Sequence, residues 1–529
     1  MADIYANARS TTGTATRFKD ISPTSGMCPI CVKNCTVLCE IGKSAFRGRE
    51  VLYPAPEEFG HSTAASNKDY GLDWSHFQIL TDVLGAEGIE PDPDRAIFPA
   101  ADVKTSAGGV PLKVPAFTAG LGSTAVAQNY WNGLAVGAAI SGTIQVIGEN
   151  ICGMDMNLKI TNGEVAHSDS LKYRVDKYRE FWDGVHGDIV VQTNVEDQRL
   201  GVDKYALSKL EVNIIERKWG QGAKAIGGEV RIDDIAKAIE LKRRGYVVLP
   251  DPEDSSVQRA FKEGAFKTFE RHSRVGFPTH EGFVEDVENL RAQGAKRVFL
   301  KTGAYRPVIT AFTLKAASEA KIDLLTFDGA GGGTGMSPVP MMNECATPTV
   351  YLQAQVMKCI ELLKKKGRYV PDIAFAGGFV NETQMFKSIA MSDMGSGPHV
   401  KAIAMARAPI TAVMKAEHFV ELANEGKLPR SFEQNYGAAP EQFFIAMSDL
   451  VDEYGARARE LPAGAVGLYT YYVDRLGTGL KQLMAGSRKF KLNLISRNDI
   501  ASISEIAERV TGIPMIDKIE SDLMESILS

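Results

Sequence analysis

The sequence predicts an α/β fold, arranged as a (β/α)8 TIM barrel with an added segment at each end. From about residue 110 onward, short β-branched or apolar runs alternate with amphipathic stretches, the pattern of βα units around a parallel sheet. Several runs end in lysine, aspartate or paired glycines, and such a barrel carries its chemistry at the carboxyl ends of its strands. No GxGxxG motif opens a helix directly after a predicted strand, which disfavours the competing doubly wound open sheet.

The predicted strands are short and end in glycine or a polar residue: 114–118, 188–193, 223–227, 297–301, 324–326, 372–376 and 400–405. Helical periodicity lies between several of them, at 232–244, 284–292, 308–320, 349–366 and 383–391. Beyond about residue 425 the pattern is helical, at 440–461, 468–485 and 500–511. We therefore expect a cysteine-rich segment at 1–60, a linking segment at 61–109, the barrel at 110–425 and a helical tail at 426–529.

Composition excludes several classes of function. The 529 residues include 60 Lys+Arg against 65 Asp+Glu, and a net charge of −5 does not suit a protein that binds nucleic acid through its phosphates. The first residues offer neither a basic n-region nor an apolar h-region, so no secretory signal is predicted. Glycines and amides interrupt the weakly polar stretch 116–147, so we expect no membrane span and a cytoplasmic protein.

Four of the seven cysteines stand in the first forty residues with the spacing CxxCxxxCxxxC: Cys28, Cys31, Cys35 and Cys39. A reducing compartment disfavours disulfides, which makes a metal role the better interpretation. Four thiolates this close can bind one tetrahedral zinc ion or one [4Fe–4S] cluster. Zinc ligands usually come as two separated pairs, so the spacing favours the cluster, with a structural zinc as the alternative. The isolated Cys152, Cys345 and Cys359 are expected to be small buried hydrophobes.

A glycine-rich segment, FDGAGGGTGMSP at 327–338, directly follows a predicted strand. Without Cβ atoms, Gly331, Gly332 and Gly333 let backbone N–H groups approach an anionic ligand closely, and Thr334 follows them. The segment predicts a loop against which a phosphate or a flavin lies. A flexible surface linker is the alternative, although such a linker would not normally follow a buried strand so abruptly.

A second glycine pair supports this prediction. Gly377 and Gly378 follow the strand at 372–376, and Ala406 and Arg407 follow the strand at 400–405. In barrels that bind phosphate, the loops after the seventh and eighth strands form the phosphate site. The pair is weak evidence alone, and it gains weight because it lies downstream of the glycine-rich segment, in the order that such a barrel requires.

Charged side chains near predicted strand ends supply candidate chemistry. Lys218, Lys224 and Lys301 could hold a substrate carboxylate or stabilise negative charge on a reduced flavin, although a solvated surface role is the commoner fate of a lysine. Glu229 and Asp328 are the nearest candidates for proton transfer.

Taken together, these motifs resemble the FMN-binding synthase domain of the glutamate synthase family. The segment from Gln221 to Lys224, followed by GGE at 227–229, is similar to the family's QGAKPGxGG segment. The segment 328–338 is similar to its GHDGGTGASP loop, with an extra residue and without the histidine, and the strand end at Lys301 resembles its VKL element. GEN at 148–150 and RLGV at 199–202 resemble further family segments, so the resemblance spans about 110–425 in family order.

The resemblance implies an FMN barrel that reduces an imine-like derivative of a 2-oxo acid to an amino acid, with electrons supplied through an iron–sulfur centre. It implies that Lys301 and Lys224 act electrostatically on flavin and substrate. The remaining residues that it implies for FMN are Gln221, the glycines 331–333 with Thr334, the pair Gly377–Gly378, and Ala406 with Arg407.

The sequence departs from the family in three places. The family's cluster cysteines follow the last barrel strand, yet 406–417 contains none, so the N-terminal four would have to serve. Met1-Ala2 offers no N-terminal cysteine nucleophile for a glutaminase, so free ammonia or a partner subunit would supply nitrogen, or the substrate is a different one altogether. The region 251–282 also differs from the family's SPPPHHD region.

The sequence leaves three functions open. The first is an FMN- and iron–sulfur-dependent oxidoreductase that takes electrons from a ferredoxin-type donor, since no separate NAD-binding unit is visible. The second is a non-redox lyase or transferase with a zinc-bound leader, and the third is an electron-transfer subunit of a larger complex. We expect the chain to form a homo-oligomer.

Overall fold

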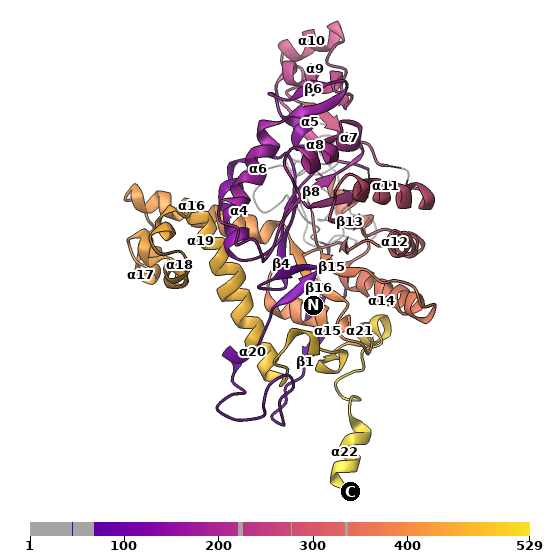
Figure 1. Ribbon diagram of the computed structural model, residues 1–529, viewed down its shortest axis with the longest axis vertical. Helices are drawn as coiled ribbons and strands as arrows, with labels where there is room; N and C mark the ends of the chain where they lie inside the picture. The colour runs from indigo at the N-terminus through magenta and orange to yellow at the C-terminus, as the bar shows by residue number, and fades with distance from the viewer. Residues whose placement is uncertain (1–44, 46–67, 221–225, 277, 334–336) are drawn as a thin grey trace, which may run out of the picture.

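The computed structural model describes residues 45, 68–220, 226–276, 278–333 and 337–529, and its centre is a closed barrel of eight parallel strands (Figure 1). Around the barrel the strands are β13 (Arg297–Gly303), β14 (Leu324–Asp328), β15 (Asp372–Ala376), β16 (Val400–Met405), β4 (Ala116–Leu121), β5 (Gln145–Ile147), β8 (Ile189–Thr193) and β9 (Ile214–Lys218). This confirms the predicted (β/α)8 barrel. In chain order β15 is the seventh strand and β16 the eighth.

Helices follow the strands and form the outer layer, and Figure 1 shows α11, α12 and α14 stacked along one side of the barrel. Asparagine side chains cap two of these helices: Asn194 before α7 and Asn381 before α15. The helices are α4 (Trp131–Ile140), α6 (Asp169–Arg179), α7 (Val195–Arg199), α8 (Val202–Ser208), α11 (His280–Ala292), α12 (Pro307–Glu319), α14 (Thr349–Lys365), α15 (Glu382–Met391) and α16 (Arg407–Asn424).

Alternate residues of each strand point into the barrel and out toward the helices. On β13, Phe299 belongs to the apolar cluster inside the barrel, whereas Val298 and Leu300 pack with the helices. The hairpin of β2 (Thr105–Ala107) and β3 (Val110–Leu112) contributes to the same inner cluster. It therefore fills one end of the barrel with apolar side chains and leaves the carboxyl end of the strands for polar groups.

An insertion between β9 and β13 forms a small antiparallel sheet, in the strand order β10-β12-β11, with its own apolar core. In Figure 1 its helices lie at the top of the view, beyond the barrel strands. Its elements are β10 (Glu229–Ile232), α9 (Ile235–Arg243), β11 (Val247–Leu249), α10 (Ser255–Lys262) and β12 (Phe269–His272).

A segment that precedes the barrel pairs with one that follows it, because β1 (Phe77–Ile79) is antiparallel to β17 (Ile500–Ser502). The C-terminal region packs α19 (Ala463–Tyr469) against α4, where Gly137 allows close approach: a Cβ there would lie 2.8 Å from the Cβ of Leu468. A π-helical segment, Thr470–Gly477, continues into α20 (Thr478–Gly486). In the part of the chain that the structure describes, no helix is both long and apolar enough to cross a membrane.

Shorter elements complete the structure. They are α3 (Ala125–Asn129), α5 (Ile151–Met154), β6 (Lys159–Thr161), β7 (Glu164–His167), α13 (Val339–Glu344), α17 (Arg430–Tyr436), α18 (Met447–Tyr454), α21 (Glu505–Thr511) and α22 (Ser521–Leu528), with 3₁₀ turns at Trp74–His76, Phe98–Ala100, Pro440–Gln442, Gly455–Glu460, Leu492–Leu494 and Arg497–Asp499.

Six predicted strands coincide with β4, β8 and β13 to β16, while β5 and β9 were not predicted. The predicted strand 223–227 lies largely outside the described residues, and 226–227 are not strand. The predicted helix 500–511 is wrong over its first residues: Ile500–Ser502 pair with β1 as β17, and the helix begins at Glu505.

Candidate functional site

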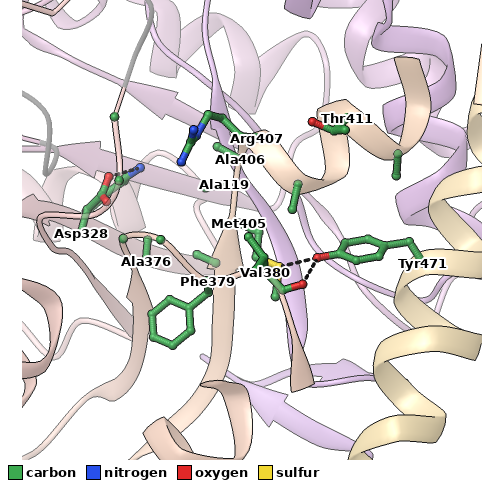
Figure 2. A pocket seen from close by; sticks show the side chains of 18 residues that line it. Ala119, Asp328, Ala376, Phe379, Val380, Met405, Ala406, Arg407, Thr411 and Tyr471 are labelled. Atoms are coloured by element: carbon green, nitrogen blue, oxygen red, sulfur yellow. Dashed lines mark hydrogen bonds and ion pairs between the residues drawn. The ribbon is translucent and has the colours of Figure 1, made fainter. Parts of the chain in front are cut away.

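A cavity of about 480 Å³ opens at the carboxyl ends of β13 to β16 and β4 (Figure 2). Eight of the residues predicted for the site line it: Lys301, Asp328, Gly332, Gly333, Gly377, Gly378, Ala406 and Arg407. Gly331 lines a neighbouring cavity that shares Gly377, Gly378 and Arg407 with the first. The structure therefore brings the two glycine segments and Lys301 together, as a barrel with its site at the strand ends requires.

The two glycine segments touch through their backbones. Gly377 has φ +115°, and a Cβ at this position would lie 2.6 Å from both the carbonyl oxygen of Gly329 and Oγ1 of Thr349. Gly331 has φ +108°, and its Cβ would lie 3.1 Å from the carbonyl oxygen of Gly377. Both backbone conformations favour glycine. The floor of the cavity at this end is consequently bare backbone, which a ligand can approach closely.

Arg407 adds a positive charge at this end of the cavity. It is the first residue of α16, and Figure 2 shows its side chain extending toward the side on which Asp328 lies. Among the described residues its guanidinium has neither a hydrogen-bond nor an ion-pair partner, and partial burial lowers its pKa. An unpaired guanidinium beside a helix N-terminus and a glycine pair suits a phosphate group.

The rest of the cavity is walled by small apolar side chains. Ala119, Ala376 and Ala404 come from β4, β15 and β16, and Met405 and Phe379 border the same space. Because alanine side chains are small, they leave open space above the strand ends. The volume of the cavity lies within the usual range of ligand pockets. A phosphate at the glycine pair, a planar ring over the alanines and a lysine at the far side are the features that FMN needs. The residues present therefore fit this cofactor.

Lys301 projects from β13 with only 6% of its surface exposed. Its Nζ lies 3.2 Å from Oδ2 of Asp328, on the neighbouring strand β14. Burial alone would lower the pKa of Lys301, but the carboxylates of Asp328 and Glu216 outweigh that effect and raise it. The lysine is therefore a fixed positive charge at the cavity wall.

A second polar group occupies the same end of the barrel. Glu149 is the second residue after β5, and its Oε1 lies 2.6 Å from Nζ of Lys218 at the end of β9. Burial works against ionisation of Glu149, but Lys218 outweighs it and lowers the pKa of the carboxyl. Beneath this pair, Nε2 of Gln192 donates to Glu216 at 2.5 Å, and burial raises the pKa of Glu216. Glu149 and Lys301 also interact electrostatically: Lys301 lowers the pKa of Glu149, and Glu149 raises the pKa of Lys301. The two ion pairs are therefore coupled.

Other predicted residues lie elsewhere. Glu229 is on β10 of the insertion, where its Oε1 lies 3.3 Å from Nδ1 of His272, and it does not line the cavity. The predictions for Gln221, Lys224, Thr334 and the four leader cysteines fall outside the described residues. Within the described ranges, no three His, Cys, Asp or Glu side chains gather as a metal site.

The expectation for the isolated cysteines holds fully for only one of them. Cys152 is buried, and burial raises the pKa of its thiol. Cys345 is exposed, so its predicted burial is wrong, whereas Cys359 is half-buried and packs against the core, as expected in part. Cys345 ends α13 and Cys359 lies on the outer helix α14, positions that sequence periodicity did not resolve.

Sequence reasoning missed a wall of the cavity that comes from the C-terminal region. Tyr471, in the π-helical segment, donates from its hydroxyl to the carbonyl oxygen of Val380 at 2.7 Å (Figure 2). Its ring lines the cavity together with Thr411 of α16. Single π-helical turns are frequent at functional sites, but no sequence pattern predicts where one will form. Glu149 was noticed only within the motif GEN, and its pairing with Lys218 could not be predicted.

The described residues form a (β/α)8 barrel with a cavity at its mouth whose lining fits FMN. Residues 272–405 match the family described as the conserved region in glutamate synthase. This match confirms the resemblance to the glutamate synthase family over β13 to β16, the part of the barrel that supplies Lys301 and both glycine segments.

Comparisons with individual proteins add little. No match to a curated protein was found. Among solved structures, the flavin-binding domain of baker's yeast flavocytochrome b2 is 10% identical, with 86% of this chain and 82% of that chain covered and a TM-score of 0.44. A soluble mutant of the membrane-associated (S)-mandelate dehydrogenase from Pseudomonas putida is 13% identical, with 81% and 88% covered and a TM-score of 0.43. Similarities of this size say nothing about substrate.

Proposed function

We propose that this protein is a glutamate synthase-like oxidoreductase that binds FMN in the cavity at the barrel mouth and reduces a 2-oxo or imino acid. One observation carries the proposal: a bare glycine floor, an arginine without a partner among the described residues and a buried lysine converge on one cavity at the ends of adjacent strands. When bound, FMN supplies hydride transfer and converts between one-electron and two-electron chemistry.

The chain's own residues would divide the work as follows. Gly377, Gly378 and Arg407 hold the phosphate, and the alanines around Ala404 leave room for the ring. Lys301 stabilises negative charge at the cavity wall, since neighbouring carboxylates keep it protonated. Asp328 fixes the position of Lys301 through their ion pair.

The Glu149–Lys218 pair lines a second cavity of about 40 Å³ at the same end of the barrel, where it would offer a carboxylate and an ammonium group to a substrate. Such a pair can exchange a proton with the substrate or receive its carboxylate. These roles suit reduction of an imine that forms from a 2-oxo acid and ammonia. Nitrogen would come from free ammonia or from a partner subunit.

The reaction is tested with enzyme reduced by light without oxygen and then mixed with ammonium and a panel of 2-oxo acids, 2-oxoglutarate included. We expect one 2-oxo acid to reoxidise the flavin and to yield the matching amino acid by mass spectrometry. If the flavin is reoxidised only by oxygen, and no amino acid forms from any member of the panel, reductive amination is not the function.

We further propose that electrons reach the barrel from a ferredoxin-type donor through a [4Fe–4S] cluster held by the four leader cysteines. The support is the spacing CxxCxxxCxxxC, since the thiolates themselves lie outside the described residues. Removing one thiolate breaks such a cluster without touching the cavity.

Cys31→Ser should therefore abolish turnover driven by reduced ferredoxin and leave bound FMN at the wild-type level. The isolated Cys345, which is exposed, supplies the matched control: Cys345→Ser should change neither quantity. Both variants are assayed with reduced ferredoxin and by flavin absorbance. Undiminished ferredoxin-driven turnover in Cys31→Ser would remove the leader from the electron path.

A further inference from the structure

A buried polar cluster joins the insertion to the barrel mouth, and Asn150 is at its centre. Asn150 is 2% exposed and follows Glu149 directly. Its Oδ1 accepts hydrogen bonds from the hydroxyl of Tyr246 at 3.1 Å and from Nδ2 of Asn194 at 3.2 Å. Its Nδ2 donates to Oγ of Ser273 at 3.2 Å. One amide side chain thus links three segments that are far apart in the sequence.

The backbone of Asn150 is held as firmly as its side chain. Its N–H donates to the carboxylate of Asp197, at 3.2 Å to Oδ1 and 3.0 Å to Oδ2. Its φ of 67° lies in the left-handed region, which asparagine and glycine adopt more readily than other residues. Burial raises the pKa of Asp197 to about 7. The turn after β5 is therefore fixed by contacts that the proposed reaction does not otherwise use.

The partners of Asn150 come from segments that follow two neighbouring barrel strands, β8 and β9. Asn194 and Asp197 belong to the segment after β8, whereas Tyr246 and Ser273 belong to the insertion. Arg271, which is 1% exposed, donates from Nη1 to Oγ of Ser273 at 2.8 Å and lies over the ring of Tyr246. The insertion consequently braces the turn that carries Glu149.

We propose that Asn150 is a positioning residue that holds the carboxylate of Glu149 against Lys218 and so makes the insertion part of the proposed active site. This inference rests on the proposed function, because it assigns the cluster to the same barrel mouth. Asn150 lines neither the cavity at the glycine segments nor the small cavity that Glu149 and Lys218 line. Asn150 would act on the site only by fixing the turn after β5, which sets the orientation of the Glu149 side chain.

The consequence is a change in the protonation of Glu149 when Asn150 is lost. A carboxylate that drifts away from Lys218 keeps its burial and loses its counter-charge, so its pKa rises. The charged and titratable groups that act on Glu149 are Lys218, Lys301, Asp197, Glu216 and Arg271. Of these, Lys218 is the one in direct contact.

The test compares Asn150→Gly with Asn162→Gly in the full-length protein. Glycine keeps the left-handed backbone and removes only the amide side chain. Asn162 is the matched control, since it is also left-handed, with φ 53°, and lies exposed in the turn between β6 and β7. Infrared spectra are recorded against pH, and the protonated-carboxyl band of Glu149 is assigned by its loss in Glu149→Gln.

We expect the titration midpoint of Glu149 to rise by about one pH unit or more in Asn150→Gly and to stay unchanged in Asn162→Gly. Tyr246→Phe, which removes one donor to Asn150, should shift the midpoint in the same direction by less. An unchanged midpoint in both Asn150→Gly and Tyr246→Phe overturns the inference. The infrared titration needs neither substrate nor flavin. If the purified protein binds no FMN, the proposed function fails, but the titration still tests the role of Asn150.

Discussion

Gly377→Ala is expected to weaken FMN binding strongly. The new Cβ would lie 2.6 Å from the carbonyl oxygen of Gly329 and from Oγ1 of Thr349, at a φ of +115° that side chains rarely adopt. Backbone strain and overpacking together cost about 2–5 kcal/mol, and both fall on the loop that would hold the phosphate. A change of about 1.4 kcal/mol in binding free energy alters Kd tenfold, so the lower end of this range corresponds to a fall in FMN affinity of about 30-fold. Equilibrium dialysis measures this affinity.

Gly367→Ala separates this effect from backbone strain alone. Gly367 follows α14 with φ +62°, and a Cβ there would meet nothing within 4 Å. The substitution should cost about 1–2 kcal/mol of stability and leave FMN affinity as in the wild type. If Gly377→Ala binds FMN as tightly as Gly367→Ala does, the glycine pair is not part of the cofactor site.

Lys301→Met is expected to have the second large effect, on the chemistry rather than on cofactor content. Methionine keeps much of the volume of lysine but removes the positive charge that Asp328 and Glu216 maintain. Negative charge on the reduced cofactor would lose its stabilising partner. We expect turnover to fall about 100-fold or more, and the two-electron midpoint potential to become more negative by about 30 mV or more.

Lys315→Met is the control for this prediction. Lys315 is exposed on α12, the helix that follows β13, so its loss removes the same charge from the same part of the chain but not from the cavity. Potential and turnover should match the wild type. Spectroelectrochemical titration of both variants decides the matter, and equal potentials in Lys301→Met and the wild type would place the lysine outside the site.

The fold was predictable where the strands are apolar. β8 and β13 to β16 are buried runs followed by glycine or polar residues, and amphipathic helices come between several of them. β9 escaped prediction because its sequence, IIERK, carries three charged side chains. The structure explains each charge: Glu216 and Lys218 face the polar mouth, and Arg217 forms ion pairs on the outer side with Asp203 and Asp286. β5 was not predicted because it is only three residues long, which is too short for the two-residue alternation of a strand to be recognised.

The site was predictable to the extent that glycine and strand order determine it. Gly377, Gly378, Arg407 and Lys301 meet at one cavity because the ends of parallel strands in a closed barrel must meet. Tyr471 could not be predicted, since the π-helical segment reaches the cavity only through the packing of α19 on α4 and α16. The cluster around Asn150 depends on an insertion whose placement no periodicity reveals.

The central claim is that the cavity at the mouth of the barrel binds FMN. The most direct measurement is the flavin content of the full-length protein purified without oxygen, by absorbance and by mass spectrometry of the released cofactor. We expect about one FMN per chain, with the same content in Gly367→Ala and a reduced content in Gly377→Ala. A wild-type protein that contains no flavin, and takes up none when FMN is added, would contradict it.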